Sequence, residues 1–295
     1  LLITVDHEGG RVQRFKTDGF THLPAMGQLG EIWMKEPTGT KIHANTGALA
    51  AMNIATACGY VLASELRACG VDFSFTPVLD LNYGNSQVIG NRAFHSDPKV
   101  VSALAKSVMM GLLQAGMAHC AKHFPGHGWV KLDSHLALPQ DSRPLSEILK
   151  VDALPYQLNS TLNMASIMPA HVVYSEVDSK PACFSSFWIQ DVLRVQFSFD
   201  GAVISDDLDM VGAHGEGDIH ARASAALQAG CDAVLVCNNF EDIASLVENP
   251  IPEAFENREV RDRRLSRLLS GPLLDWASLR QTYMYQAAID RITNI

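Results

Sequence analysis

Positive charge is scarce in this 295-residue chain, which has 23 Lys and Arg against 32 Asp and Glu and a formal net charge of -9. Nucleic acids and anionic membrane surfaces are bound mainly through basic patches. The acidic balance therefore argues against both kinds of partner. We expect a protein that binds no nucleic acid and no membrane.

The chain also lacks paired cysteine motifs and long apolar runs. Its six cysteines would allow disulfides, but none forms CxxC and most lie in apolar periodic segments. We therefore expect reduced, buried thiols, as in a cytoplasmic protein.

No apolar run approaches the roughly 20 residues of a membrane-spanning helix, so the sequence predicts no such helix. No signal peptide is visible, although a chain that begins with Leu1 inside an apolar strand says little about its N-terminus.

Short apolar runs alternate with longer segments of helical periodicity. The runs are Leu1–Asp6, Val71–Asp80, Met117–Phe124, Met164–Val172, Gly201–Asp207 and Cys231–Asn238. Their centres are continuously apolar, which is typical of strands buried on both faces of a parallel sheet. The segments between them have helix-end signals: Asp97 fits an N-cap, Pro98 a first helical position and Gly116 a left-handed C-terminal position. Repeated strand–helix units without a break in composition predict one α/β domain over 1–295.

The residues at the strand ends favour a closed barrel over a doubly wound sheet. Nearly every predicted strand ends in a chemically reactive side chain: Asp6, Asp80, His123, His171, Asp206 and Asn238. Barrel enzymes assemble their active site from the C-terminal ends of many strands, whereas an open sheet concentrates it at one switch point.

The densest set of reactive side chains lies between Lys122 and His135, in a loop rich in glycine. Asp133 and His135 are two residues apart, so the carboxylate can orient the imidazole and support the imidazolium that forms during proton transfer. Two alternatives remain open. The histidines could merely bond to the backbone, or His123, His127, Asp133 and His135 could hold a metal, although HExxH is absent.

Three further segments carry candidate site residues. The adjacent acids Asp206 and Asp207 end a buried strand, where one carboxylate fits a pocket and the other fits a helix N-cap. Asp6 ends the first apolar run and is the expected ligand contact there. Arg92, in a loop, could bind a ligand with two hydrogen bonds, but an exposed salt-bridging arginine explains it equally well.

These segments occur in a familiar order. They are Val-Asp-His-Glu-Gly-Gly-Arg-Val-Gln-Arg-Phe, Gly-Asn-Arg-Ala-Phe-His-Ser-Asp-Pro, Lys-His-Phe-Pro-Gly-His-Gly with Asp-Ser-His, Ile-Met-Pro-Ala-His-Val-Val-Tyr and Ser-Asp-Asp-Leu-Asp-Met. Together they closely resemble the bacterial cytoplasmic β-N-acetylglucosaminidases of glycoside hydrolase family 3, from residue 1 to at least residue 240. The stretch Glu31–Asn45 is longer than this resemblance leads us to expect.

The resemblance implies a single-domain TIM-type (β/α)8 barrel, with its first strand and helix lacking in this chain, so that the domain is N-terminally incomplete. It implies a monomeric, cofactor-free enzyme of peptidoglycan recycling that removes terminal N-acetylglucosamine from 1,6-anhydro-N-acetylmuramic acid muropeptides with retention. The residues that match the motif are Asp206 as nucleophile, His135 as acid/base assisted by Asp133, and Asp6, Arg92, Lys122 and His123 as sugar contacts. A barrel that binds sugar without turnover is the remaining alternative.

Overall fold

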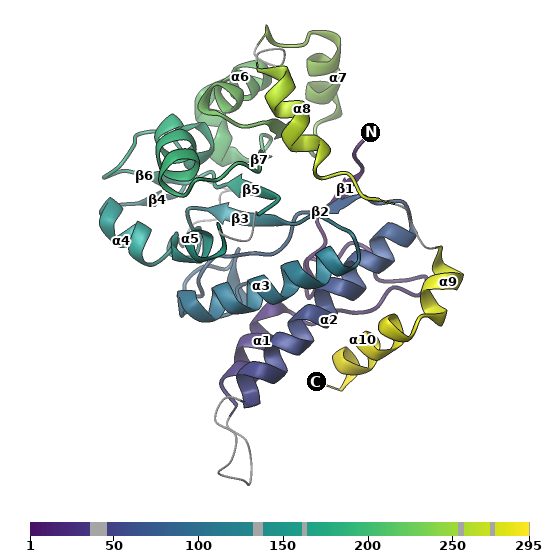
Figure 1. Cartoon of the computed structure of the whole chain (residues 1–295). Coiled ribbons are helices and arrows are strands. Elements are labelled where there is room, and N and C mark those ends of the chain that lie inside the picture. The colour runs from purple at the N-terminus through teal and green to yellow at the C-terminus, as the bar shows by residue number, and fades with distance from the viewer. Residues whose placement is uncertain (36–45, 132–137, 161–163, 253–256, 272–274, 295) are drawn as a thin grey trace. The chain divides into compact units, whose positions relative to one another are not determined.

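The computed structural model describes residues 1–35, 46–131, 138–160, 164–252, 257–271 and 275–294, which Figure 1 shows as a cartoon. The chain divides into two compact units. The first unit comprises Leu1–Asn82, Asn91–Ala121 and Leu268–Ile295, and the second comprises Tyr83–Gly90 and Lys122–Arg267. The single catalytic domain over residues 1–295 stays a prediction.

Helices dominate the first unit. They are α1 (Met26–Trp33), α2 (Thr46–Ala68), α3 (Pro98–Gln114), α9 (Trp276–Gln281) and α10 (Tyr283–Thr293), with a 3-10 turn at Gly90–Arg92 that enters this unit from the second. The long helix α2 packs against α1, α3 and α10. Glycines without a Cβ allow it to approach α3 closely. A Cβ added at Gly59 would collide with the Val108 carbonyl, and one at Gly111 would collide with the Thr56 carbonyl. The predicted caps of α3 are confirmed: Asp97 accepts a hydrogen bond from the Lys99 amide, and Gly116 has φ +75°.

Helix α2 bears on the expectation that no helix spans a membrane. By length and composition alone, this 23-residue helix could cross a membrane. A core helix passes the same test because it is apolar around much of its circumference. Its inward residues, among them Val61, Leu62 and Leu66, are at most 2% exposed in the unit.

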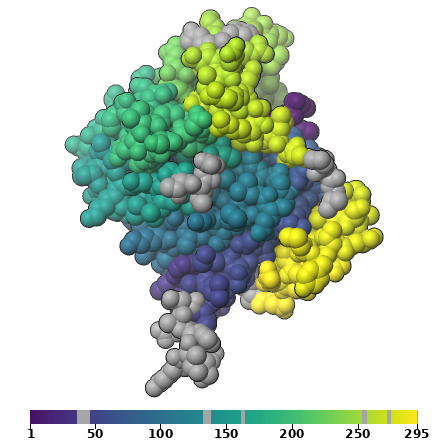
Figure 2. Space-filling model, viewed as in Figure 1, coloured from purple at the N-terminus to yellow at the C-terminus, as the bar shows by residue number. Residues whose placement is uncertain are grey.

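The first unit also contains two parallel strands and the C-terminal segment. Strand β1 (Thr4–Val5) pairs with β2 (Phe73–Ser74). The C-terminal segment returns to this unit, where the Tyr285 hydroxyl donates to Glu65 Oε1 at 2.6 Å. Helices α9 and α10, yellow in Figure 2, lie at the surface in that view.

A four-stranded sheet of order β3–β5–β7–β8 organises the second unit, which the chain enters within β3. Its strands are β3 (Cys120–Phe124), β5 (Ser166–Pro169), β7 (Ala202–Asp207) and β8 (Ala233–Leu235). Both β5–β7 and β7–β8 pair in parallel, with Ile167 opposite Val203 and Ile204 opposite Ala233. Each of the six predicted apolar runs contains one observed strand. The pair β4 (Gln140–Asp141) and β6 (Val173–Tyr174), also parallel, was not predicted.

Helices and an aromatic cluster complete the second unit. The helices are α4 (Leu145–Lys150), α5 (Leu154–Ser160), α6 (Ile219–Ala229), α7 (Phe240–Glu248) and α8 (Arg258–Ser266), with 3-10 turns at Ala182–Phe184 and Val211–Glu216 and a π-helix at Phe187–Gln196. Phe124 packs edge-on against Tyr156 and Trp188, with ring centroids 5.2 and 6.1 Å apart. These rings anchor the C-terminal end of β3, from which the glycine-rich loop leaves.

The described residues therefore form an α/β protein with parallel sheets, as predicted; a closed ring of strands is not among the sheets that they form. All six cysteines are free thiols, and four are buried, but Cys69 and Cys237 are exposed. The prediction of buried thiols is wrong for these two.

Candidate active site

The two acids at the end of β7 have different environments. Asp206 accepts a hydrogen bond at Oδ1 from the Asp207 amide at 2.8 Å. Asp207 Oδ1 accepts from the amides of Asp209 and Cys237, both at 3.1 Å. The second carboxylate therefore organises the loops after β7 and β8. This division matches the expectation that one acid has a structural role, although Asp207 is not the N-cap of a helix.

The charges around Asp206 favour its ionised form. Burial alone would raise the pKa of this carboxyl, but His123, His171 and Lys122 together with the Asp207 amide lower it below its usual range. The pKa of Asp207, in contrast, is raised, mainly by burial. The surroundings of Asp206 thus favour the ionised form, which is the form that a carboxylate nucleophile needs.

His171 lies just after β5, beside the end of β7. Its side chain is fully buried, and its ring stacks on Phe184 with centroids 5.2 Å apart. Burial lowers the pKa of His171, despite the nearby charge of Asp206. Burial therefore disfavours the imidazolium form of His171, while the carboxylate of Asp206 favours it.

The end of β3 and the start of the glycine-rich loop are buried. Lys122, His123 and His127 are 2%, 7% and 2% exposed. The rings of His123 and His127 lie edge to face, 6.0 Å apart. The other two candidates in this loop, Asp133 and His135, lie outside the described residues.

A cluster that sequence reasoning missed supports this loop. The Tyr174 hydroxyl donates to the Gly126 carbonyl at 2.9 Å, and a Cβ at Gly126 would lie 2.7 Å from the Asp152 Cβ. Arg143 binds Asp152 at 2.8 Å and places its guanidinium 4.3 Å from the centre of the Trp129 ring. Tyr174 ends one of the quoted motifs and Trp129 directly follows another, which was the only signal available. Arg143 and Asp152 lie outside them, and no spacing links them to the loop.

In the first unit, the guanidinium of Arg92 lies between acids. It donates through Nε and Nη2 to Glu8 at 2.9 and 2.7 Å, and its side chain is only 10% exposed. Burial alone would lower the pKa of Arg92, but Glu8, Asp6 and Asp80 raise it. The alternative of an exposed salt bridge is therefore wrong, because this ion pair is buried. Asp6 itself is partly exposed, 3.8 Å from Arg14.

The structure thus gathers the candidates in two groups. Asp206, Lys122 and His123 interact within the second unit, and Asp6 interacts with Arg92 within the first. Among the described residues, no group of three or more His, Cys, Asp or Glu side chains could hold a metal ion. The proposed metal set includes Asp133 and His135, so this search does not test it.

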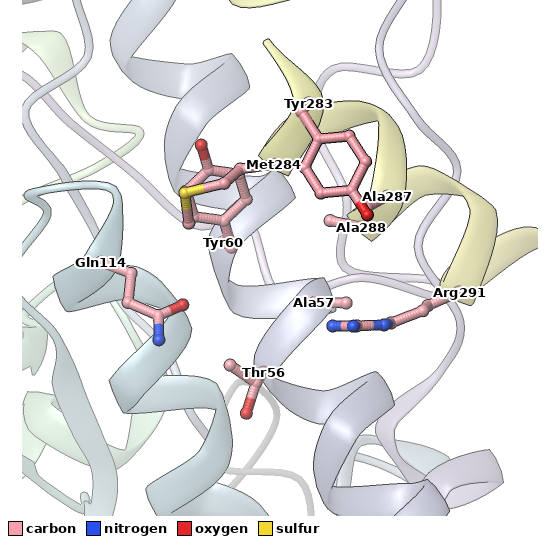
Figure 3. Close-up of a pocket in the computed structure, with 9 residues that line it drawn as sticks. All are labelled: Thr56, Ala57, Tyr60, Gln114, Tyr283, Met284, Ala287, Ala288 and Arg291. Carbon is pink, nitrogen blue, oxygen red and sulfur yellow. The ribbon is translucent and has the colours of Figure 1, made fainter.

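A separate cavity of about 300 Å³ lies in the first unit between α2, α10 and the end of α3. Figure 3 shows Tyr60 and Met284 on one side of it and the Arg291 side chain reaching across from α10. Its lining contains no candidate site residue.

A parallel α/β fold with reactive side chains at the ends of its strands is typical of an α/β enzyme. The chain belongs to glycosyl hydrolase family 3: the model of that family's N-terminal domain matches residues 1–269.

Named relatives narrow the activity. The chain is 56% identical over 290 residues to a β-hexosaminidase of Bordetella avium, an alignment that covers 98% of the chain and 78% of the relative. NagZ from Neisseria gonorrhoeae, solved in complex with N-trifluoroacetyl-D-glucosamine, is 46% identical with a TM-score of 0.88, covering 100% of this chain and 81% of that one. The same protein in complex with zinc ion matches with 44% identity, a TM-score of 0.87 and the same coverage. The chain is therefore a glycoside hydrolase of the β-hexosaminidase type. This finding argues against the alternative of a barrel that binds sugar without turnover.

Proposed function

We propose that the chain is a retaining exo-β-N-acetylglucosaminidase with Asp206 as its nucleophile. The observation that carries this proposal is the state of the Asp206 carboxyl, whose pKa is held below its usual range at the end of a parallel strand. An ionised carboxylate beside Lys122 and His123 can attack an anomeric carbon without prior deprotonation.

The reaction has two displacements. Asp206 attacks the anomeric carbon, the glycosidic C–O bond breaks, and His135 gives its proton to the departing oxygen. His135 then takes a proton from water, whose oxygen attacks the same carbon and releases Asp206 as carboxylate. Asp133 orients the imidazole and supports its charge. The match to the family motif supports these roles of His135 and Asp133.

The proposed substrate is a muropeptide in which terminal N-acetylglucosamine is β-linked to 1,6-anhydro-N-acetylmuramic acid, and the proposed role is peptidoglycan recycling in the cytoplasm. The sugar complex of the N. gonorrhoeae relative supports recognition of an N-acylated glucosamine. Lys122 and His123 would contact this sugar together with Asp6 and Arg92. The proposed fold is a TIM-type barrel.

Turnover of an aryl N-acetyl-β-glucosaminide, followed by proton NMR of the first anomer released, tests the mechanism. A β-anomer that appears first and then mutarotates supports retention. An α-anomer would overturn the double displacement. Hydrolysis of the purified anhydro-disaccharide then tests the substrate separately.

A further inference from the structure

An open cavity of about 650 Å³ lies in the second unit beside the end of β7. It is lined by the loop after β7, the loop after β8 and the start of α6 and α7, with Asp209, His214, Arg222, Phe240, Glu241 and Asp242 among its residues. None of these residues is among the candidate catalytic or sugar-contacting residues.

Hydrogen bonds tie this cavity to the nucleophile. The Asp207 amide donates to Asp206, and Asp207 in turn accepts from the Asp209 amide. Asp209 Oδ2 accepts from the amides of Asn238 and Asn239 at 3.2 and 3.0 Å. The loop after β7, which forms one wall of the cavity, therefore begins directly after the proposed nucleophile. The carboxylates of Asp207 and Asp209 connect this loop to the loop after β8.

The cavity offers groups of both charge signs on a fixed frame. Arg222 donates through Nε to the Gly217 carbonyl at 2.8 Å and through Nη1 to the Leu208 carbonyl at 2.6 Å, which fixes the guanidinium plane. The imidazole of His214 bonds through Nε2 to the Asp209 carbonyl at 3.0 Å. Arg222 is partly buried, and the carboxylates of Asp209, Glu241 and Asp242 line the same cavity.

Phe240 is the second unusual feature. It is the first residue of α7 and is 81% exposed, although the large apolar side chains of this unit are mostly buried. A rigid aromatic ring at the rim of a polar cavity is a common element of recognition sites, because it supplies apolar contact area at low conformational cost.

We propose that this cavity binds the leaving-group side of the substrate, and specifically a short peptide carried by the departing sugar. This inference rests on the proposed function. A peptide has carboxylates for Arg222 and His214, an ammonium group for Asp209, Glu241 and Asp242, and apolar side chains for Phe240. A departing sugar without a peptide has hydroxyls but no ammonium group, so it would leave the acids unmatched.

The test compares two natural-type substrates that differ only in the peptide. They are the disaccharide of N-acetylglucosamine and 1,6-anhydro-N-acetylmuramic acid, with and without its peptide. The measured quantity is the ratio of kcat/KM for the peptide-bearing substrate to that for the peptide-free one. We expect Phe240→Ala to lower this ratio by about tenfold, a change equivalent to about 1.4 kcal/mol of binding, mostly through KM. Val247→Ala, at a position on the same helix that is 75% exposed and outside the cavity lining, should leave the ratio unchanged.

The outcomes separate the two proposals. If the wild-type enzyme hydrolyses the aryl glycoside but neither disaccharide, the proposed substrate is wrong and this inference with it. If it hydrolyses both disaccharides and Phe240→Ala leaves the ratio at the wild-type value, only the inference is overturned. Equal thermal melting of both variants would show that the comparison is not affected by folding.

Discussion

The ring Nε2 of His171 lies 3.1 Å from the backbone carbonyl oxygen of Asp207. Since a carbonyl only accepts, the ring carries a proton on Nε2 and donates it to this oxygen. The bond joins the chain just after β5 to the end of β7, next to Asp206. His171 therefore positions the end of β7 and, in the proposed mechanism, the nucleophile Asp206.

Replacing His171 separates its hydrogen bond from its bulk. His171→Leu should lower kcat by about tenfold with little change in KM, because the end of β7 loses its support and a buried carbonyl loses its donor, at a cost of about 1–3 kcal/mol of stability. His171→Gln keeps an N–H donor and should recover part of both losses. Steady-state kinetics on an aryl N-acetyl-β-glucosaminide and thermal melts measure them. Equal kcat in both variants and the wild type would contradict a positioning role.

The two acids of β7 should respond differently to amidation. Asp206→Asn should lose roughly 10³-fold or more in kcat and remain folded, since its volume is kept and its nucleophilic charge is lost. Asp207→Asn should retain measurable turnover and melt at a lower temperature, because its carboxylate accepts from the amides of Asp209 and Cys237. Kinetics and circular dichroism on both variants provide the check. A dead Asp207 variant beside an active Asp206 variant would reverse the assignment.

The sequence predicted the parts of the fold that depend on neighbouring residues. Continuous apolar runs revealed the strands of the parallel sheets, and Asp97, Pro98 and Gly116 marked the ends of α3 because caps act within one turn. The strands Gln140–Asp141 and Val173–Tyr174 were missed because neither has an apolar run of its own: the first is polar, and the second directly follows the run that contains β5. The membrane-like composition of α2 was missed because its polar residues interrupt every apolar run.

In the candidate site, too, only features that depend on neighbouring residues could be predicted. Reactive residues at strand ends were predictable because parallel strands end on one side of a sheet. Partners distant in sequence were not: Arg92 and Glu8 are separated by 84 residues, and no local pattern connects them. The support of Gly126 by Tyr174, 48 residues later, is of the same kind. Such pairs are defined only once the chain is folded.

Acid should destabilise the first unit through His119. Burial lowers the pKa of this imidazole to about 4, from 6.5. As pH falls below 6.5, the unfolded chain takes up a proton that the folded unit excludes, so stability is lost between pH 6.5 and about 4, by at most about 3 kcal/mol. His119→Gln should flatten the decline measured by urea unfolding across this range. Part of the decline in stability should remain in this variant, because burial also lowers the pKa of His7 to about 4. An unchanged slope in His119→Gln, matching that of the exposed-site control His22→Gln, would contradict this assignment.

Turnover should not require a metal ion. The proposed mechanism is completed by a carboxylate and an imidazole, and the sequence lacks HExxH. Prolonged dialysis against EDTA should leave kcat on the aryl glycoside unchanged. The zinc complex of the N. gonorrhoeae relative makes the reverse experiment informative. Activity that disappears on dialysis and returns with added zinc would favour the metal site of His123, His127, Asp133 and His135.

The proton transfer assigned to His135 predicts a dependence on the leaving group. A sugar alkoxide departs poorly without a proton, whereas a dinitrophenolate departs almost unaided. The rate of the His135→Ala variant should therefore fall by about 10²–10⁴-fold on the disaccharide but much less in the glycosylation step with the dinitrophenyl glycoside.

Deglycosylation in this variant then becomes slow. A burst of dinitrophenolate should appear, and the glycosyl-enzyme on Asp206 should accumulate. Azide should speed the breakdown of this intermediate to the β-glycosyl azide. Asp133→Ala should show the same pattern more mildly, because its imidazole remains. Equal losses on both substrates, with no burst and no azide product, would mean that His135 holds the loop or the sugar and moves no proton.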